Sequence, residues 1–146
     1  MNGSVILCGL GNVGWHVLQC LRSAGFPVVV VDTLAKPTDS RLFGVRLVAG
    51  DCRDGDTLIQ AGLLNARGVI ITTSDDLLNT SCALLVRRLA PHVRIVLRMF
   101  NQNLVAGLGK AVSNITALSV SALAAPLLAL SATTGEVLAT FPVLGD

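Results

Sequence analysis

The stretch VILCGLGNVGWHVLQCLRSAGFPVVVVD, residues 5–32, decides the fold. It begins in a short apolar run, Ser4–Cys8, which predicts a buried strand. A helical pattern with one apolar face follows, and a second apolar run, Pro27–Val31, closes on Asp32. Between the first run and the helix stand three glycines in G-x-G-x-x-G spacing: Gly9, Gly11 and Gly14. The order strand, glycine turn, helix, strand, acid predicts a dinucleotide-binding unit.

Each part of this unit has a mechanical reason. Gly9 permits a tight turn, Gly11 leaves the backbone open to a pyrophosphate, and Gly14 lets the helix lie close to the strand. The helix N-terminus offers free N–H groups and a partial positive charge to phosphate. Asp32 follows Gly14 by 18 residues, where a carboxylate can accept both hydroxyls of an adenosine ribose. In the alternative, the glycines only shape the turn and Asp32 caps a loop; the agreement of all parts favours nucleotide binding.

Composition limits the class of protein. The chain has 146 residues, enough for one domain with its own core, and is 52% hydrophobic with a mean hydropathy of +0.70. These values suit a parallel sheet that is buried on both faces. A net charge of +2 is too small to indicate nucleic acid or an anionic membrane surface as a partner. No apolar run is long enough to span a bilayer, and the first residues lack a signal pattern, so we expect no direct membrane insertion.

The four cysteines are Cys8, Cys20, Cys52 and Cys82, and none forms a C-x-x-C pair. We interpret them as small buried apolar residues in a reducing compartment. Their spacing favours neither a metal site nor a redox role.

Beyond Asp32, apolar runs alternate with helical patterns. A loop over residues 34–43 has room for one short helical turn. We expect further strands over residues 46–49, 68–73, 93–99 and 115–120, and helices over residues 56–64, from Asp76 to Ala90, and over residues 102–109. This alternation predicts an α/β fold, a Rossmann-like doubly wound parallel sheet of six strands. We expect Asp75 and Asp76 to stabilise the N-terminus of their helix, because their negative charges interact favourably with the positive end of the helix dipole.

Two charged residues, one at and one just after the carboxyl end of a predicted strand, lie at the edge where open α/β sheets bind ligands. Asp51 has two interpretations: a contact to the adenosine edge, or a cap for the helix that begins near Asp54. Arg98, on the same strand face as Arg94, has two as well: a pair with a phosphate oxygen, or a surface ion pair with an acid such as Asp75.

The C-terminal segment does not fit the alternation. Residues 121–130, SALAAPLLAL, form a helical pattern that is apolar nearly all round and contains Pro126, and residues 137–143 predict a last short strand. We therefore divide the chain into a nucleotide-binding domain, residues 1–120, and a C-terminal helix and strand, residues 121–146. The excess of apolar surface favours a crossover helix that packs on a second copy, over one that folds back on its own sheet.

Together these motifs resemble the regulator of potassium conductance (RCK) domain, also called the potassium-transport nucleotide-binding (KTN, TrkA-N type) domain. The resemblance covers residues 5–143. The resemblance rests on these residues and motifs: GLGNVG at 9–14, Asp32, GDCRD at 50–54, TTSDDLLN at 72–79, and Arg98.

The resemblance implies a cytoplasmic ligand-sensing domain of a potassium channel or transporter. Such domains bind NAD(H), or ATP, ADP or AMP, form homodimers and higher rings, and pass a dimer hinge change to the membrane subunit. It also implies that Asp51 and Cys52 flank the adenine, and that Thr72 and Thr73 line the phosphate side. The candidate nucleotide-binding residues are Gly9, Leu10, Gly11, Asn12, Val13, Gly14, Asp32, Thr33, Asp51, Cys52, Thr72, Thr73, Ser74 and Arg98.

The given sequence shows neither the regulatory C-terminal subdomain nor the pore segment that often accompany this family, so we expect either a piece of a channel polypeptide or a separate subunit. Trp15, just after the last glycine, is expected to face outward, as an interface contact or as an exposed aromatic. A small NAD-dependent oxidoreductase is the main rival function. The chain has no tyrosine, and we expect His16 and His92 to be solvated, so no catalytic residues are predicted. A third alternative is an interaction module that binds no nucleotide.

Overall fold

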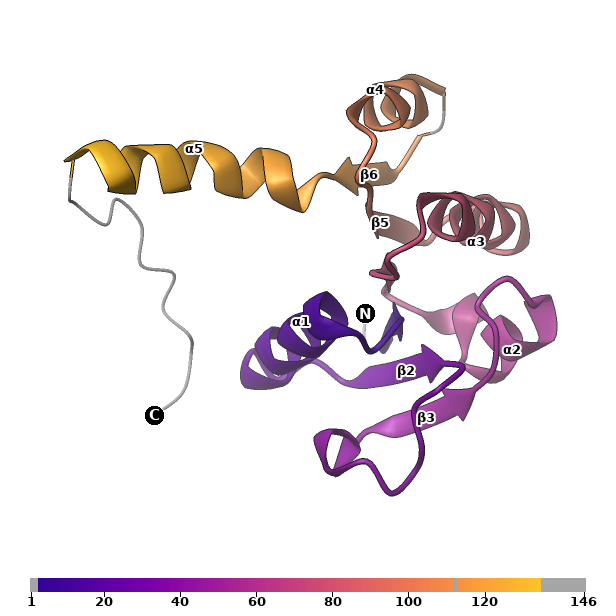
Figure 1. The fold of residues 1–146 in the computed structure, drawn as a ribbon. Helices are drawn as coiled ribbons and strands as arrows, with labels where there is room; N and C mark the ends of the chain where they lie inside the picture. The colour runs from indigo at the N-terminus through magenta and orange to yellow at the C-terminus, as the bar shows by residue number, and fades with distance from the viewer. Residues whose placement is uncertain (1–2, 112, 135–146) are drawn as a thin grey trace.

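One six-stranded, all-parallel sheet organises the molecule (Figure 1). The computed structural model describes residues 3–111 and 113–134. The sheet has the order β3-β2-β1-β4-β5-β6, so the strand order reverses between β1 and β4. This arrangement confirms the predicted Rossmann-like fold. The strands are β1 (Val5–Cys8), β2 (Val28–Asp32), β3 (Arg46–Ala49), β4 (Gly68–Ile71), β5 (Arg94–Arg98) and β6 (Ile115–Leu118).

The helices cover the two faces of the sheet unequally. On one face α1 packs against β1 and β2, with Leu18 of the helix buried beside Leu7 and Val30. The opposite face carries α2, α3 and α4 over a larger core that includes Ile6, Ile71 and Leu97. Among the described residues, no helix combines the length and the apolar character needed to cross a bilayer. The helices are α1 (Asn12–Ser23), η1 (Ser40–Leu42), α2 (Gly55–Gln60), η2 (Leu63–Asn65), α3 (Asp76–Leu89), α4 (Gln102–Ala111) and α5 (Val120–Thr134).

Two details of the predicted helices are wrong. The helix expected over residues 56–64 is interrupted, because Gly62 adopts a φ of 91° and separates α2 from η2. On α3 the sequence pattern predicts a wide apolar face made of Leu77, Leu78, Cys82, Leu84, Leu85 and Leu89. This face is too wide, because Leu77 is 76% exposed and Leu84 is 49% exposed, while the polar Asn79 is fully buried. The reason for the second error is that Asn79 satisfies backbone groups at the sheet edge, as described below, so a polar residue takes a core position.

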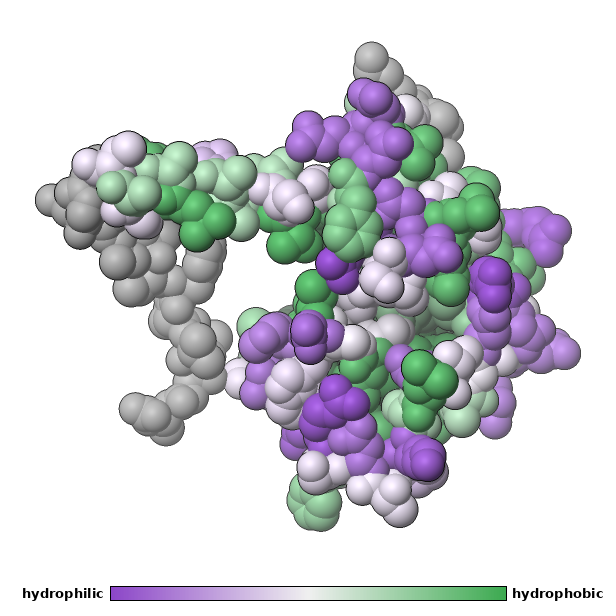
Figure 2. All heavy atoms as spheres, viewed as in Figure 1, coloured by the Kyte–Doolittle hydropathy of each residue, from purple (hydrophilic) through white to green (hydrophobic). Residues whose placement is uncertain are grey.

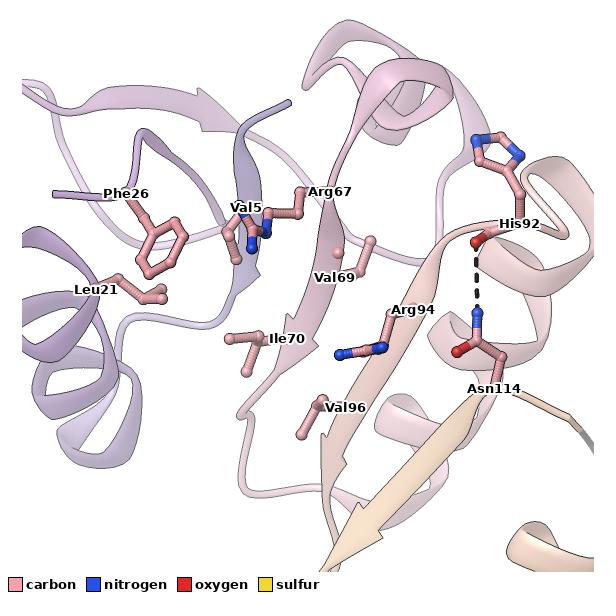
Figure 3. Close-up of a pocket in the computed structure, with 11 residues that line it drawn as sticks. Val5, Leu21, Phe26, Arg67, Val69, Ile70, His92, Arg94, Val96 and Asn114 are labelled. Atoms are coloured by element: carbon pink, nitrogen blue, oxygen red, sulfur yellow. Dashed lines mark hydrogen bonds between the residues drawn. The ribbon is translucent and has the colours of Figure 1, made fainter. Parts of the chain in front are cut away.

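Among residues 3–111 and 113–134, no helix covers the face of the sheet beyond α1. Ile70 of β4 and Val96 of β5 line a cavity of about 590 Å³ there, with Leu21 at the end of α1 on one side and Arg94 on the other (Figure 3). In a single doubly wound domain this apolar surface would be covered. It is therefore a surface that a further apolar element could cover.

The helix α5 does not supply that cover within the chain. It leaves β6 and runs away from the sheet (Figure 1), so the fold-back alternative is wrong. Its surface is largely apolar (Figure 2), and Leu123 and Leu128 are 59% and 69% exposed. Pro126 lies inside the helix without ending it. The short strand predicted over residues 137–143 lies outside the described residues.

Candidate functional site

The turn between β1 and α1 shows why its glycines are needed. Gly9 has a φ of +96°, a region that L side chains rarely adopt. A Cβ on Gly14 would lie 1.9 Å from the carbonyl oxygen of Gly9, so α1 can approach β1 only without a side chain there. A Cβ on Gly11 would meet nothing within 4 Å. The predicted tight turn at Gly9 and the close approach of the helix at Gly14 are thus confirmed. At Gly11 the backbone is open to its surroundings.

Two side chains hold this turn in place. The Thr72 hydroxyl, buried just after β4, donates to the carbonyl oxygen of Gly9 at 2.9 Å. The Leu10 amide donates to Asp32 Oδ2 at 2.7 Å. The turn is therefore braced from β4 on one side and from β2 on the other.

The Asp32 carboxylate also organises the loop that follows it. Its Oδ1 accepts hydrogen bonds from the amides of Leu34 and Ala35, at 2.7 and 2.8 Å. A carboxylate offers about four acceptor positions, and three are used by these bonds and the one from Leu10. Asp32 therefore caps a loop, as the alternative interpretation expected, and keeps one acceptor position for a ligand hydroxyl.

A small hollow of about 160 Å³ lies at the carboxyl ends of the strands, next to the glycine turn. Six of the expected residues line it: Gly9, Asp32, Thr33, Asp51, Cys52 and Thr73. Arg53 and Leu78 line it as well and were not expected. The structure thus brings together residues that follow β1, β2, β3 and β4. The remaining expected residues do not line the hollow. They lie in the glycine turn, in the first turn of α1, after β4 and, for Arg98, at the end of β5, and Ser74 is exposed.

Asp51 does not cap α2, so that alternative is wrong. The cap is Asp54, whose Oδ2 accepts from the Thr57 amide at 2.9 Å. Asp51 instead forms an ion pair with Arg53, with 2.7 Å between Oδ2 and Nη2. Hydrogen bonds from the Arg53 side chain hold the pKa of Asp51 below its usual range. A carboxylate and a guanidinium thus stand together at the rim of the hollow. The sequence D-x-R, with Asp51 and Arg53 two residues apart, was the signal that could have predicted this ion pair.

Asn79 is a structural residue that the sequence analysis missed. Its Nδ2 donates to the carbonyl oxygens of Thr73, at 3.0 Å, and Arg98, at 2.9 Å, while the Thr73 hydroxyl donates to its Oδ1. These bonds tie the end of β4 to the end of β5. The signal that could have identified Asn79 is its place, as a polar residue, on the apolar face of α3.

The acids at the start of α3 are structural, as charge suggested. Asp75 caps the helix by accepting from the Leu78 amide at 3.0 Å. Asp76 accepts from the amides of Phe100 and Asn101, each at 2.8 Å, and so fixes the turn after β5.

Arg98 lies at the end of β5 with its Cζ 4.4 Å from the centroid of the Phe100 ring. Among the described residues, ion pairs join only Arg41 to Asp39 and Arg53 to Asp51, so the alternative of an ion pair between Arg98 and an acid such as Asp75 is wrong. Its Nε is buried and has no hydrogen-bond partner. Such a donor is rare and calls for an acceptor.

Three cysteines from distant parts of the chain meet below the hollow. The sulfur atoms of Cys8, Cys52 and Cys82 lie within 4.8 Å of one another, and all three residues are buried. Hydrogen bonds from Cys8 and then Cys82 lower the pKa of Cys52, and the pKa values of the two donors are raised. The fourth cysteine, Cys20, is exposed.

Trp15 does not face outward. It is half-buried and packs against the core under α1, with the Arg41 Cζ 6.0 Å from its ring centroid. His16 and His92 are exposed, as predicted.

A family model now decides the assignment, because the TrkA-N domain model matches residues 5–118. This chain belongs to the TrkA-N domain family. The resemblance inferred from the motifs is thereby confirmed. Potassium channel protein 1 of Methanocaldococcus jannaschii is 27% identical over 99 residues, which cover 66% of this chain and 30% of that protein. The putative K(+) efflux antiporter KefB of Alkalimonas amylolytica is 31% identical over 108 residues, 73% of this chain and 16% of the antiporter.

Solved structures agree with this TrkA-N assignment. The GsuK channel bound to NAD matches with a TM-score of 0.76 and 29% identity, over 88% of this chain and 23% of the channel chain. GsuK bound to ADP matches with a TM-score of 0.78 and 29% identity, over 92% of this chain and 35% of that chain. The chain spans 30% or less of the length of the two curated relatives.

Proposed function

We propose that this TrkA-N domain senses an adenine nucleotide and regulates a potassium channel or transporter. The observation that carries the proposal is the braced, open glycine turn next to Asp32, at the point where the strand order reverses. The channel and antiporter relatives support a potassium-transporting membrane subunit as the partner.

The ligand that we propose is NAD(H). ADP or ATP is the alternative ligand, and AMP is a further, shorter alternative. The GsuK structures with NAD and with ADP support both classes. The hollow is small, so the adenosine would occupy it and the phosphates would lie over Gly11. Asp32 disfavours NADP, because a 2′-phosphate would meet its carboxylate. At the other side, Arg98 has a buried donor that a phosphate oxygen would satisfy.

We propose that two copies form a dimer through α5 and the uncovered sheet face. Exposed leucines on α5 and the apolar side chains of Ile70 and Val96 in the cavity support this, since an apolar partner would cover both surfaces. Arg67, His92 and Arg94 line the same cavity. Residues 1–120 would then bind the nucleotide, and residues 121–146 would join the copies, in a dimer or a higher ring. A ligand that binds one dimer geometry better than another shifts the population toward it and so acts on the membrane subunit.

We propose no catalytic role and a cytoplasmic location. The chain has no tyrosine for a proton relay, and both histidines are exposed and outside the hollow. Buried free thiols support a reducing compartment.

Isothermal titration with NAD, NADH, ADP, ATP and NADP tests the proposal directly. We expect heat with at least one of the first four and a weaker response to NADP. Small-angle scattering with and without that ligand then reports the dimer geometry. Absence of binding by all five, and by AMP in the same titration, at high concentration would refute the sensing function, and steady NADH oxidation with a small carbonyl compound would replace it with an oxidoreductase.

A further inference from the structure

The cluster of three buried cysteines is more than apolar packing, because its members converge from three separate elements. Cys8 ends β1, Cys52 follows β3, and Cys82 lies in the middle of α3. Their sulfur atoms all lie within 4.8 Å of one another. Three residues that are far apart in the sequence thus bring their sulfur atoms, which are soft metal ligands, close together.

The spacing of the sulfur atoms is close to what one metal ion requires. With metal–sulfur bonds of about 2.3 Å, three thiolates in trigonal or tetrahedral arrangement lie about 3.8–4.0 Å apart. The sulfur atoms of this cluster would therefore have to approach one another by at most about 1 Å. Rotation of the cysteine side chains provides movements of that size, so the backbone need not rearrange.

The burial of the cluster specifies the kind of ion. Cys8 and Cys82 are fully buried and Cys52 is 6% exposed, so hydrated ions that prefer oxygen, such as Mg²⁺ and Ca²⁺, are poorly suited. Thiolate sulfur selects thiophilic ions such as Zn²⁺ and Cu⁺. Binding of a divalent ion would release the three thiol protons to water and leave a complex of net charge −1, far less costly to bury than three bare thiolates.

The hollow supplies what the cluster lacks. Cys52 lines it, so in the nucleotide-free protein an ion can enter from that side, and a water molecule there can complete four-fold coordination. We propose that Cys8, Cys52 and Cys82 form a binding site for a thiophilic closed-shell cation of the zinc, cadmium or copper(I) class. The site rests on the cysteine geometry alone and does not depend on nucleotide binding.

Cadmium is a suitable probe, because thiolate-to-cadmium charge transfer gives an ultraviolet band that thiols alone lack. We expect the reduced protein to bind one Cd²⁺ per chain with this band and with a raised melting temperature, both when titrated folded and when refolded with the ion. Cys52→Ser and Cys82→Ser should lose the band, and Cys20→Ser should keep it, because Cys20 is exposed and outside the cluster. Competition by Zn²⁺ and by Cu⁺ then identifies the ion that binds more tightly.

Two results would overturn the proposal. One is the absence of a charge-transfer band in the folded and the refolded protein. The other is a band that Cys20→Ser abolishes and Cys52→Ser leaves intact, which would place the ion on the surface. A variant that fails to fold does not obscure the outcome, since anomalous scattering from a cadmium-soaked crystal of the unaltered protein shows directly whether an ion lies between the three sulfur atoms.

Discussion

Replacing Gly11 by alanine tests the nucleotide site with little effect on the fold. Gly11 precedes α1 with φ −73° and ψ −166°, an extended conformation open to any residue. An added Cβ meets nothing within 4 Å in the free protein. Alanine is a poorer N-cap than glycine, so we expect a loss of about 1 kcal/mol or less in the free energy of unfolding.

The same methyl group should damage binding. It would stand where the pyrophosphate approaches the turn, and would hold it away from the amides at the start of α1. Losing one charge-assisted hydrogen bond costs about 1.5–3 kcal/mol, which corresponds to roughly 10- to 150-fold weaker affinity. Titration calorimetry with the nucleotide that binds the unaltered protein measures this directly.

Gly14→Ala is the matched control, since it adds the same methyl group three residues later. Its Cβ would lie 1.9 Å from the Gly9 carbonyl oxygen, so α1 must move away from β1 by about 1 Å. We expect about 1–3 kcal/mol of destabilisation and a melting temperature lower by roughly 5–10 °C. If Gly11→Ala bound the nucleotide as tightly as the unaltered protein, the turn would not be where phosphate binds, and the reasoning would fail.

Three further substitutions test the other parts of the model. Asn79→Ala leaves the carbonyl oxygens at the ends of β4 and β5 without a donor, so we expect about 2–4 kcal/mol of destabilisation in urea unfolding; an unchanged midpoint would contradict this. Arg98→Gln should weaken nucleotide binding about tenfold or more, while Arg94→Gln, on the same strand face but at the opposite end, should not; equal effects would exclude a phosphate contact. Leu128→Glu on α5 should dissociate the dimer in analytical ultracentrifugation, whereas the equally exposed Leu77→Glu on α3 should leave it intact.

The fold was predictable because its signals are local. Alternation of strand and helix patterns, with a glycine turn after the first strand, admits few topologies once crossovers are right-handed. The predicted helix bounds were wrong where a single residue changes the backbone direction. Gly62 does so through its positive φ, which ends the helical segment after α2. For α5 the sequence favours packing on a second copy but does not identify the surface that it covers, because a pattern that is apolar all round specifies burial but not the burying surface.

The site was predictable only in part, for a physical reason. Gly9, Asp32 and Thr73 follow strand ends, and parallel strands bring their carboxyl ends to one edge. By contrast, the functions of Asn79 and Arg53 depend on contacts that no periodicity encodes. The cysteine cluster is the clearest case: spacings of 44 and 30 residues carry no metal signal, and only the packing of α3 on the sheet brings the three sulfur atoms together.

The position of the candidate site between the two halves of the sheet explains how a bound nucleotide could act at a distance. Asp32 belongs to the half that holds the turn, whereas Arg98 and α5 belong to the half that ends in β6. Asn79 joins the ends of β4 and β5 within that second half. A ligand that contacts Asp32 and Arg98 at once therefore links the turn to the strand next to the one from which α5 emerges. A shorter ligand that contacts only Asp32 would leave that link unmade, so we expect ligands that share an adenosine to differ in their effect on the proposed dimer.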